Sequence, residues 1–134
     1  MTRPMTLDPV SLPPEALTFL FERHLATLTT LRADGTPHVT PVGFTFDPAA
    51  VVVRIITTAG SVKVRHILAG RTGVSVCQVE GPRWITLEGR ARIARDPESV
   101  RVAVEAYSGR YRMPRERNDR VAIEFRVERV LGRI

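Results

Sequence analysis

The sequence predicts a mainly β protein, with six antiparallel strands in a barrel and three short helices between them. Several segments alternate apolar and polar residues with the period of a half-buried strand. Asp34-Gly35 is a strong hairpin signal between two of these segments. Strands joined mainly by hairpins favour an antiparallel barrel over a doubly wound sheet. The chain has 134 residues, which is enough for one domain with its own core.

The first half of the chain predicts a tail, a helix and three strands. Residues 1–13 are expected to form a flexible tail. A helix over residues 14–24 begins at paired prolines, where a missing N–H costs nothing. Residues 25–47 are expected to form two strands around the hairpin turn. A third strand, residues 51–58, is rich in β-branched side chains.

The second half predicts two more helices and three more strands. Ser61 is expected to cap a short helix that ends at Gly70. A later helix begins at Asp96, where a capping carboxylate precedes a proline. The remaining predicted segments are strands over residues 73–79, 83–93 and 120–132, and a polar loop over residues 113–119.

Charge, motifs and apolar runs indicate which kinds of partner the protein is expected to have. The net charge is +6, which favours anionic ligands. The chain has no zinc-finger spacing, aromatic RNA-binding motif or obvious helix-turn-helix, so we expect no nucleic-acid partner. No apolar run reaches the roughly 18 residues of a membrane span, and residues 1–16 lack the apolar run of a secretory signal. We therefore expect a cytoplasmic protein without a membrane partner.

No set of residues indicates a metal site or a catalytic pair. His24, His38 and His66 lack zinc-ligand spacing, and Cys77 is the single cysteine, expected in the core. No motif places a nucleophile beside a base. If the protein is an enzyme, its chemistry is therefore expected to come from a cofactor.

The segment after the third strand is the best candidate for an anion site. Thr57 and Thr58 end the strand, and Ser61 and Lys63, the only lysine of the chain, follow a glycine-containing turn. Hydroxyl groups and a mobile cation suit a phosphate. An ordinary capped helix with a solvated lysine explains the same residues. Trp84 likewise either stacks on a planar ligand or packs as a large apolar side chain.

Three stretches together resemble a known family. HLATLTTLRADGTPHVTPVGFTFD, RIITTAGSVKVRHILAGRTGVSV and RWITLEGRARI resemble the pyridoxamine-phosphate-oxidase-like split β-barrel flavoproteins. They are most similar to the branch that uses the deazaflavin coenzyme F420. The resemblance covers residues 14–131 and implies a split barrel and a homodimer that binds its cofactor at the subunit interface.

The resemblance also implies roles for individual residues. The cofactor phosphate would be held by Thr57, Thr58, Ser61 and Lys63, with His38 on the phosphate side. The deazaflavin ring would lie along Thr40, Pro41 and Val42, near Gln78 and Trp84. Arg54 and Arg65 are candidates for the acidic oligoglutamate tail of the coenzyme.

The implied activity is hydride transfer from reduced F420 to a conjugated small molecule. A tetrapyrrole is the expected substrate, with reduction of biliverdin to bilirubin as the best candidate. Its propionates would pair with Arg110, Arg112, Arg115 and Arg117, although a solvated polar loop explains these arginines too. Two alternatives stay open: an oxidoreductase of the same fold that binds FMN, and a non-catalytic protein that binds F420, FMN or haem.

Overall fold

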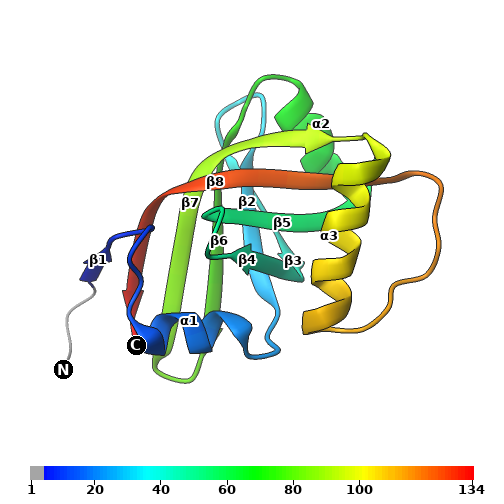
Figure 1. The fold of residues 1–134 in the computed structure, drawn as a ribbon. Helices are drawn as coiled ribbons and strands as arrows, with labels where there is room; N and C mark the ends of the chain where they lie inside the picture. Colours follow the sequence, from blue (N-terminus) through cyan, green and yellow to red (C-terminus); the bar gives the residue numbers. More distant parts are fainter. Residues whose placement is uncertain (1–4) are drawn as a thin grey trace.

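A single antiparallel sheet of eight strands forms most of the molecule (Figure 1). The computed structural model describes residues 5–134. The strand order is β3-β2-β6-β7-β8-β5-β4, and β1 pairs with β8. The strands are β1 (Met5–Leu7), β2 (Ala26–Leu31), β3 (Pro37–Val42), β4 (Phe44–Asp47), β5 (Val52–Thr58), β6 (Gly73–Glu80), β7 (Arg83–Ala94) and β8 (Arg120–Arg133).

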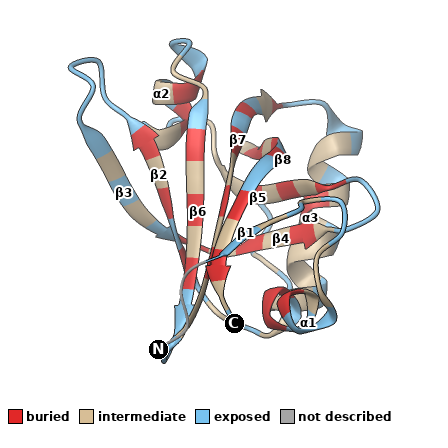
Figure 2. Ribbon diagram, turned by 90° about the vertical axis from the view of Figure 1, so that its left-hand side faces the viewer, coloured by how far each residue is buried: buried red, intermediate tan, exposed pale blue. Residues whose placement is uncertain are grey.

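The two end strands of the sheet, β3 and β4, follow one another in sequence through Gly43. The chain therefore passes directly from one edge of the sheet to the other, which requires the sheet to curl. Figure 2 shows the resulting two leaves, with β3, β2 and β6 on one side and β8, β5 and β4 on the other. Buried positions alternate along the strands and face the space between the leaves.

The long strands β7 and β8 bend where their pairing shifts, between Glu88 and Gly89. A Cβ atom at Gly89 would collide with the carbonyl oxygen of Arg126 and lie 2.7 Å from the ring of Phe125. Only glycine therefore permits the close approach of the two strands at this bulge.

Three helices complete the fold: α1 (Pro14–Phe21), α2 (Val62–Leu68) and α3 (Pro97–Arg110). The Asp96 side chain accepts a hydrogen bond from the Ser99 N–H at 2.9 Å and caps α3, as the sequence predicted. Ala103 of α3 packs on Ala94 and Ala122, on the face of the sheet opposite the main core. No helix among the described residues is long and apolar enough to span a membrane.

The predicted fold class is confirmed, with two more strands than expected. Residues 25–47 form three strands because the chain changes edges at Gly43. A Cβ there would lie 3.0 Å from the Tyr107 ring, so α3 also requires a glycine at this break. β1 lies inside the expected tail, of which residues 1–4 fall outside the described residues. Helix α1 ends at Phe21, earlier than predicted, because Glu22 is extended with ψ 147°.

Candidate functional site

The end of β5 and the start of α2 form the predicted anion site. Thr57 Oγ1 donates a hydrogen bond to Ser61 Oγ at 3.3 Å. The main chain turns where the Ser61 N–H binds the Thr58 carbonyl at 3.1 Å, and the Ala59 N–H binds the Asp119 carbonyl at 2.8 Å. Ser61 occupies the predicted N-cap position, but its hydroxyl makes no cap bond and remains beside Thr57.

Lys63, the cation predicted for this site, lies in the first turn of α2, two positions after Ser61. Its side chain is half-buried, and no carboxylate of the described residues lies within ion-pair distance of it. Burial lowers the pKa of the ammonium group from its ordinary value. A partly desolvated cation without a counter-ion gains stability from a bound anion. We call Thr57, Ser61 and Lys63 the anion cup.

Two histidines lie together near the anion cup: His66 belongs to α2, and His38 lies on β3. Thr30, fully buried on β2, hydrogen-bonds His66 Nδ1 at 2.9 Å, and the His38 ring lies edge-on to His66 with centroids 5.3 Å apart. His38 Nδ1 is buried and has no hydrogen-bond partner among the described residues. Burial, followed by the charges of His38 and neighbouring arginines, lowers the pKa of His66. The sequence singled out His38 but treated His66 as an ordinary polar residue.

The expected ring-binding residues lie on an open edge of the sheet. β3 pairs with β2 alone, so one edge of its main chain is not used by the sheet. Thr40 is half-buried, Pro41 exposed and Val42 buried. Trp84 lies on the outward face of β7, opposite the core residue Ile85.

Two other predicted cofactor residues are engaged inside the fold. Gln78 is completely buried, and its Nε2 group donates to the Phe19 carbonyl at 2.8 Å. Arg54 pairs with Asp47 at 3.2 Å and with Glu124 at 3.6 Å. Neither side chain is directed to the anion cup. Arg65, in contrast, is exposed on α2.

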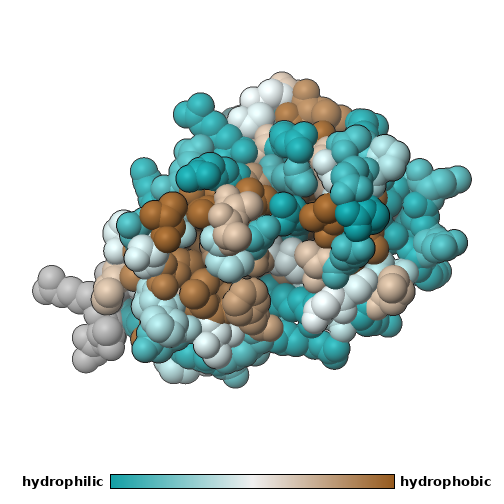
Figure 3. All heavy atoms as spheres, viewed as in Figure 1, coloured by the Kyte–Doolittle hydropathy of each residue, from teal (hydrophilic) through white to brown (hydrophobic). Residues whose placement is uncertain are grey.

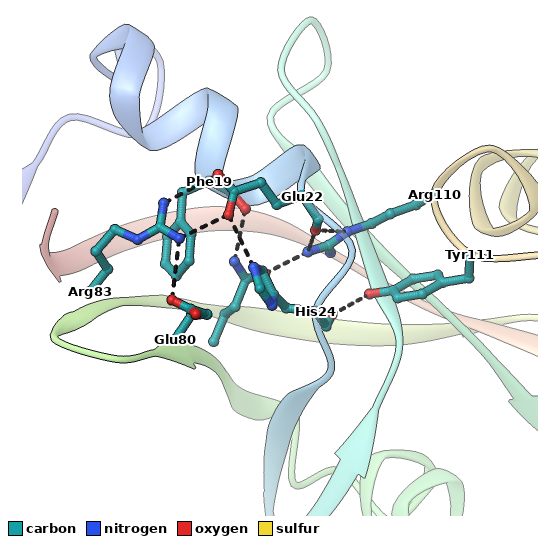
Figure 4. Close-up of polar contacts among 8 residues, drawn as sticks. Phe19, Glu22, His24, Glu80, Arg83, Arg110 and Tyr111 are labelled. Carbon is teal, nitrogen blue, oxygen red and sulfur yellow. Dashed lines mark hydrogen bonds and ion pairs between the residues drawn. The ribbon is translucent and has the colours of Figure 1, made fainter.

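Arg110 joins three parts of the protein (Figure 4). Its guanidinium donates to the Glu22 carbonyl at 2.6 and 3.0 Å, to the Phe44 carbonyl at 2.6 Å and to Gln78 Oε1 at 2.6 Å. The neighbouring Tyr111 hydroxyl donates to the His24 carbonyl at 2.8 Å. These bonds attach the end of α3 to the segment after α1 and to β4. Sequence reasoning missed this arrangement, because all the acceptors are distant in the chain.

A cluster of charged residues lies on the other side of the same segment (Figure 4). Arg83 binds both carboxylate oxygens of Glu22, at 3.0 and 3.2 Å, and its guanidinium lies 4.4 Å from the centre of the Phe19 ring. His24 Nε2 lies 3.0 Å from Glu22. The hydrogen bonds from Arg83 and then His24 lower the pKa of Glu22. Ion pairs hold this cluster together. The pair between Arg83 and Glu22 attaches the end of α1 to the turn between β6 and β7.

The four arginines that were expected to bind substrate propionates lie apart in the structure. Arg115 and Arg117 line a cavity of about 1140 Å³ between α3 and the loop that follows it. Arg112 is exposed and does not line this cavity, and Arg110 is held as described above. The four arginines therefore do not form one group.

An antiparallel sheet that curls so that its two edge strands follow one another in sequence defines a split-barrel protein. A family model for pyridoxamine 5'-phosphate oxidase matches residues 12–133. The chain therefore belongs to the pyridoxamine 5'-phosphate oxidase family, as the resemblance of its sequence predicted.

Several proteins of known sequence or structure are similar to this chain. Over 119 residues the chain is 56% identical to an F420H(2)-dependent biliverdin reductase of Mycobacterium tuberculosis, covering 88% of this chain and 85% of that protein. A solved structure named F420 reductase superposes with a TM-score of 0.73 at 26% identity, covering 89% of this chain and 98% of the other. A conserved hypothetical protein of Mycobacterium tuberculosis has a TM-score of 0.75 at 24% identity, covering 90% and 82%, and shows the fold alone.

Proposed function

We propose that this protein is an F420-dependent reductase that converts biliverdin to bilirubin. The observation that carries the proposal is the half-buried Lys63, which has no carboxylate partner among the described residues and lies two positions after Ser61 in the anion cup. The similarity to an F420H(2)-dependent biliverdin reductase supports this choice of cofactor and substrate.

The residues of the cup fit a phosphate group. Lys63 supplies a cation, and Ser61 and Thr57 supply hydroxyl groups that are hydrogen-bonded to each other. His38 Nδ1 is a buried polar atom without a partner among the described residues, which an added acceptor or donor would satisfy. These groups would hold the phosphate of F420.

F420 in its reduced form supplies the hydride. The chain would hold the coenzyme and the substrate in place. The open edge of β3 at Thr40 and Pro41 would offer main-chain groups to the planar ring, and the anion cup would fix the phosphate end of the coenzyme. A biliverdin molecule stacked beside that edge would be shielded from water by the outward face of the neighbouring strands. The hydride would go to the central bridge of biliverdin, and a proton delivered to a pyrrole nitrogen would complete the reduction. The alignment of the two molecules is what the chain contributes to the hydride step.

We further propose a homodimer in the cytoplasm, with the cofactor at the subunit interface. The outward face of β3, β2, β6 and β7 is exposed and carries few charges. Val39 is 57% exposed and Val79 60%, and Trp84 is paired with Val79 across the strands on the same face. A second copy covering this face would bury these side chains and enclose the edge of β3.

Cofactor titration of matched variants tests the proposal. The wild type should bind F420 more tightly than FMN. Lys63→Met should weaken F420 binding by about 1.5–3 kcal/mol, the range for a hydrogen bond to a charged group. Arg126→Gln removes an exposed cation from β8 and should leave the dissociation constant unchanged. Preferential FMN binding, or an unchanged constant for Lys63→Met, would refute the assignment.

A further inference from the structure

An open cavity lies between α3 and the loop that leads to β8. Its volume is about 1140 Å³. One side is a single face of α3 that includes Pro97, Val100 and Val104, and the other side is the segment 115–120. Figure 1 shows this loop arching away from the helix. In Figure 3 this side is covered mainly by hydrophilic residues, with hydrophobic atoms visible between them. The cavity thus combines an apolar wall with a polar rim.

The rim carries a surplus of positive charge. Five arginines line the cavity, and two of them are neutralised locally: Arg101 binds Glu98 and Glu105, each at 2.6 Å, and Arg117 binds Asp119 at 2.9 Å. The other three arginines have no carboxylate within ion-pair distance among residues 5–134. They are Arg95, Arg115 and Arg120, and the lining carboxylate left to balance them is Glu116.

Two residues that line the cavity contact the turn between β5 and α2, which leads to the anion cup. Arg120 on β8 is directly paired with Thr58 on β5, and the Asp119 carbonyl accepts the Ala59 N–H at 2.8 Å. Arg95 directly follows β7, whose last residue, Ala94, pairs with Ala122 on β8. The ends of three neighbouring strands therefore bring Arg95 and Arg120 toward the turn that leads to the cup.

We infer that this arginine-rimmed cavity binds the carboxylates of a ligand that also occupies or adjoins the anion cup. Arg95, Arg115 and Arg120 are its cationic contacts, and Val100 and Val104 pack against the apolar part of the ligand. The arginines and valines of the cavity stand independently of the proposed function. The identity of the ligand that carries the carboxylates rests on that proposed function. The source of these carboxylates is either the oligoglutamate tail of F420 or the propionates of the tetrapyrrole.

Binding to a triple variant tests the inference without measuring turnover. Arg95→Gln, Arg115→Gln and Arg120→Gln are combined, and Arg126→Gln is the control for loss of an exposed arginine elsewhere. Dissociation constants are measured for F420 with and without its glutamate tail, and for biliverdin and its dimethyl ester. Tetraglutamate is a fifth probe, titrated into the protein alone. Thermal unfolding of each variant confirms that it is folded.

The triple variant should lose about tenfold or more in affinity for at least one carboxylate-bearing probe, since three modest charge interactions are removed together. The counterparts that lack these carboxylates, F420 without its glutamate tail and the dimethyl ester of biliverdin, should bind the triple variant and the control equally. A loss for tailed F420 alone identifies the tail, and a loss for biliverdin alone identifies the propionates. Added salt should reduce the difference.

The inference is overturned if tetraglutamate, tailed F420 and biliverdin all bind the triple variant within twofold of the control. Equal losses for a probe with its tail or propionate carboxylates and for its counterpart without them also overturn it, because the arginines would then not recognise those carboxylates. If the wild type binds neither F420 nor biliverdin, the proposed function fails. In that case tetraglutamate alone decides whether the cavity holds carboxylates.

Discussion

Replacing Arg110 by methionine tests whether this residue holds the fold together or binds substrate. The change removes a guanidinium that donates to two main-chain carbonyls, of Glu22 and Phe44, and to Gln78 Oε1, which is completely buried. Hydrogen bonds from a charged group contribute about 1.5–3 kcal/mol each, and neighbouring bonds are not additive. Because Arg110 itself is only half-buried, we expect a loss of about 2–4 kcal/mol in the free energy of unfolding.

Urea and thermal unfolding measure this loss. For a chain of this length about 1 kcal/mol corresponds to roughly 3–5 °C in Tm, so Tm should fall by roughly 6–20 °C. Arg112→Met is the matched control: Arg112 is exposed, and the change should stay within about 0.5 kcal/mol. An Arg110→Met protein of wild-type stability with a raised KM for substrate would refute the structural role.

Two further predictions concern the bulge and the histidine pair. Gly89→Ala should destabilise the protein by about 2 kcal/mol or more in urea unfolding, since its Cβ would collide with main chain. Gly109→Ala, in α3 with open space around the added Cβ, should stabilise it by about 0.5–1 kcal/mol, and equal effects would contradict this account. Because the pKa of His66 is lowered in the folded protein, its contribution to stability is present above about pH 6.5 and lost as the pH falls through the lowered value. Thermal unfolding of His66→Gln should therefore show a smaller fall in Tm between pH 7.5 and 5.5 than the wild type, whereas identical pH profiles would exclude this contribution.

Local sequence signals predicted the elements that depend on neighbouring residues. The Asp96 cap of α3, the Asp34-Gly35 hairpin and the turn before Ser61 each involve contacts within a few positions. The break at Gly43 was not predictable in this way. It depends on Tyr107, which approaches from a helix more than sixty positions later in the chain.

The same distinction applies to the candidate site. The anion cup lies within seven residues, so a site there could be predicted from the spacing of its hydroxyl and amino groups and from the family resemblance. The contacts of Gln78, Arg54 and Arg110 are made with distant segments, and sequence proximity gave no signal of them. The surplus of arginine around the α3 cavity likewise emerges only after the local ion pairs are known.

The proposed reaction of this protein, hydride transfer from reduced F420 to biliverdin, can be followed with an isotope label. The measurement uses reduced F420 that carries deuterium at both positions of C5, so that either face transfers a deuteride. It is mixed with the protein and biliverdin in ordinary water, and the bilirubin formed is analysed by mass spectrometry. Direct hydride transfer should give bilirubin with one deuterium at its central bridge, formed as F420 is oxidised. Bilirubin without deuterium, or no oxidation of F420 by biliverdin, would contradict it.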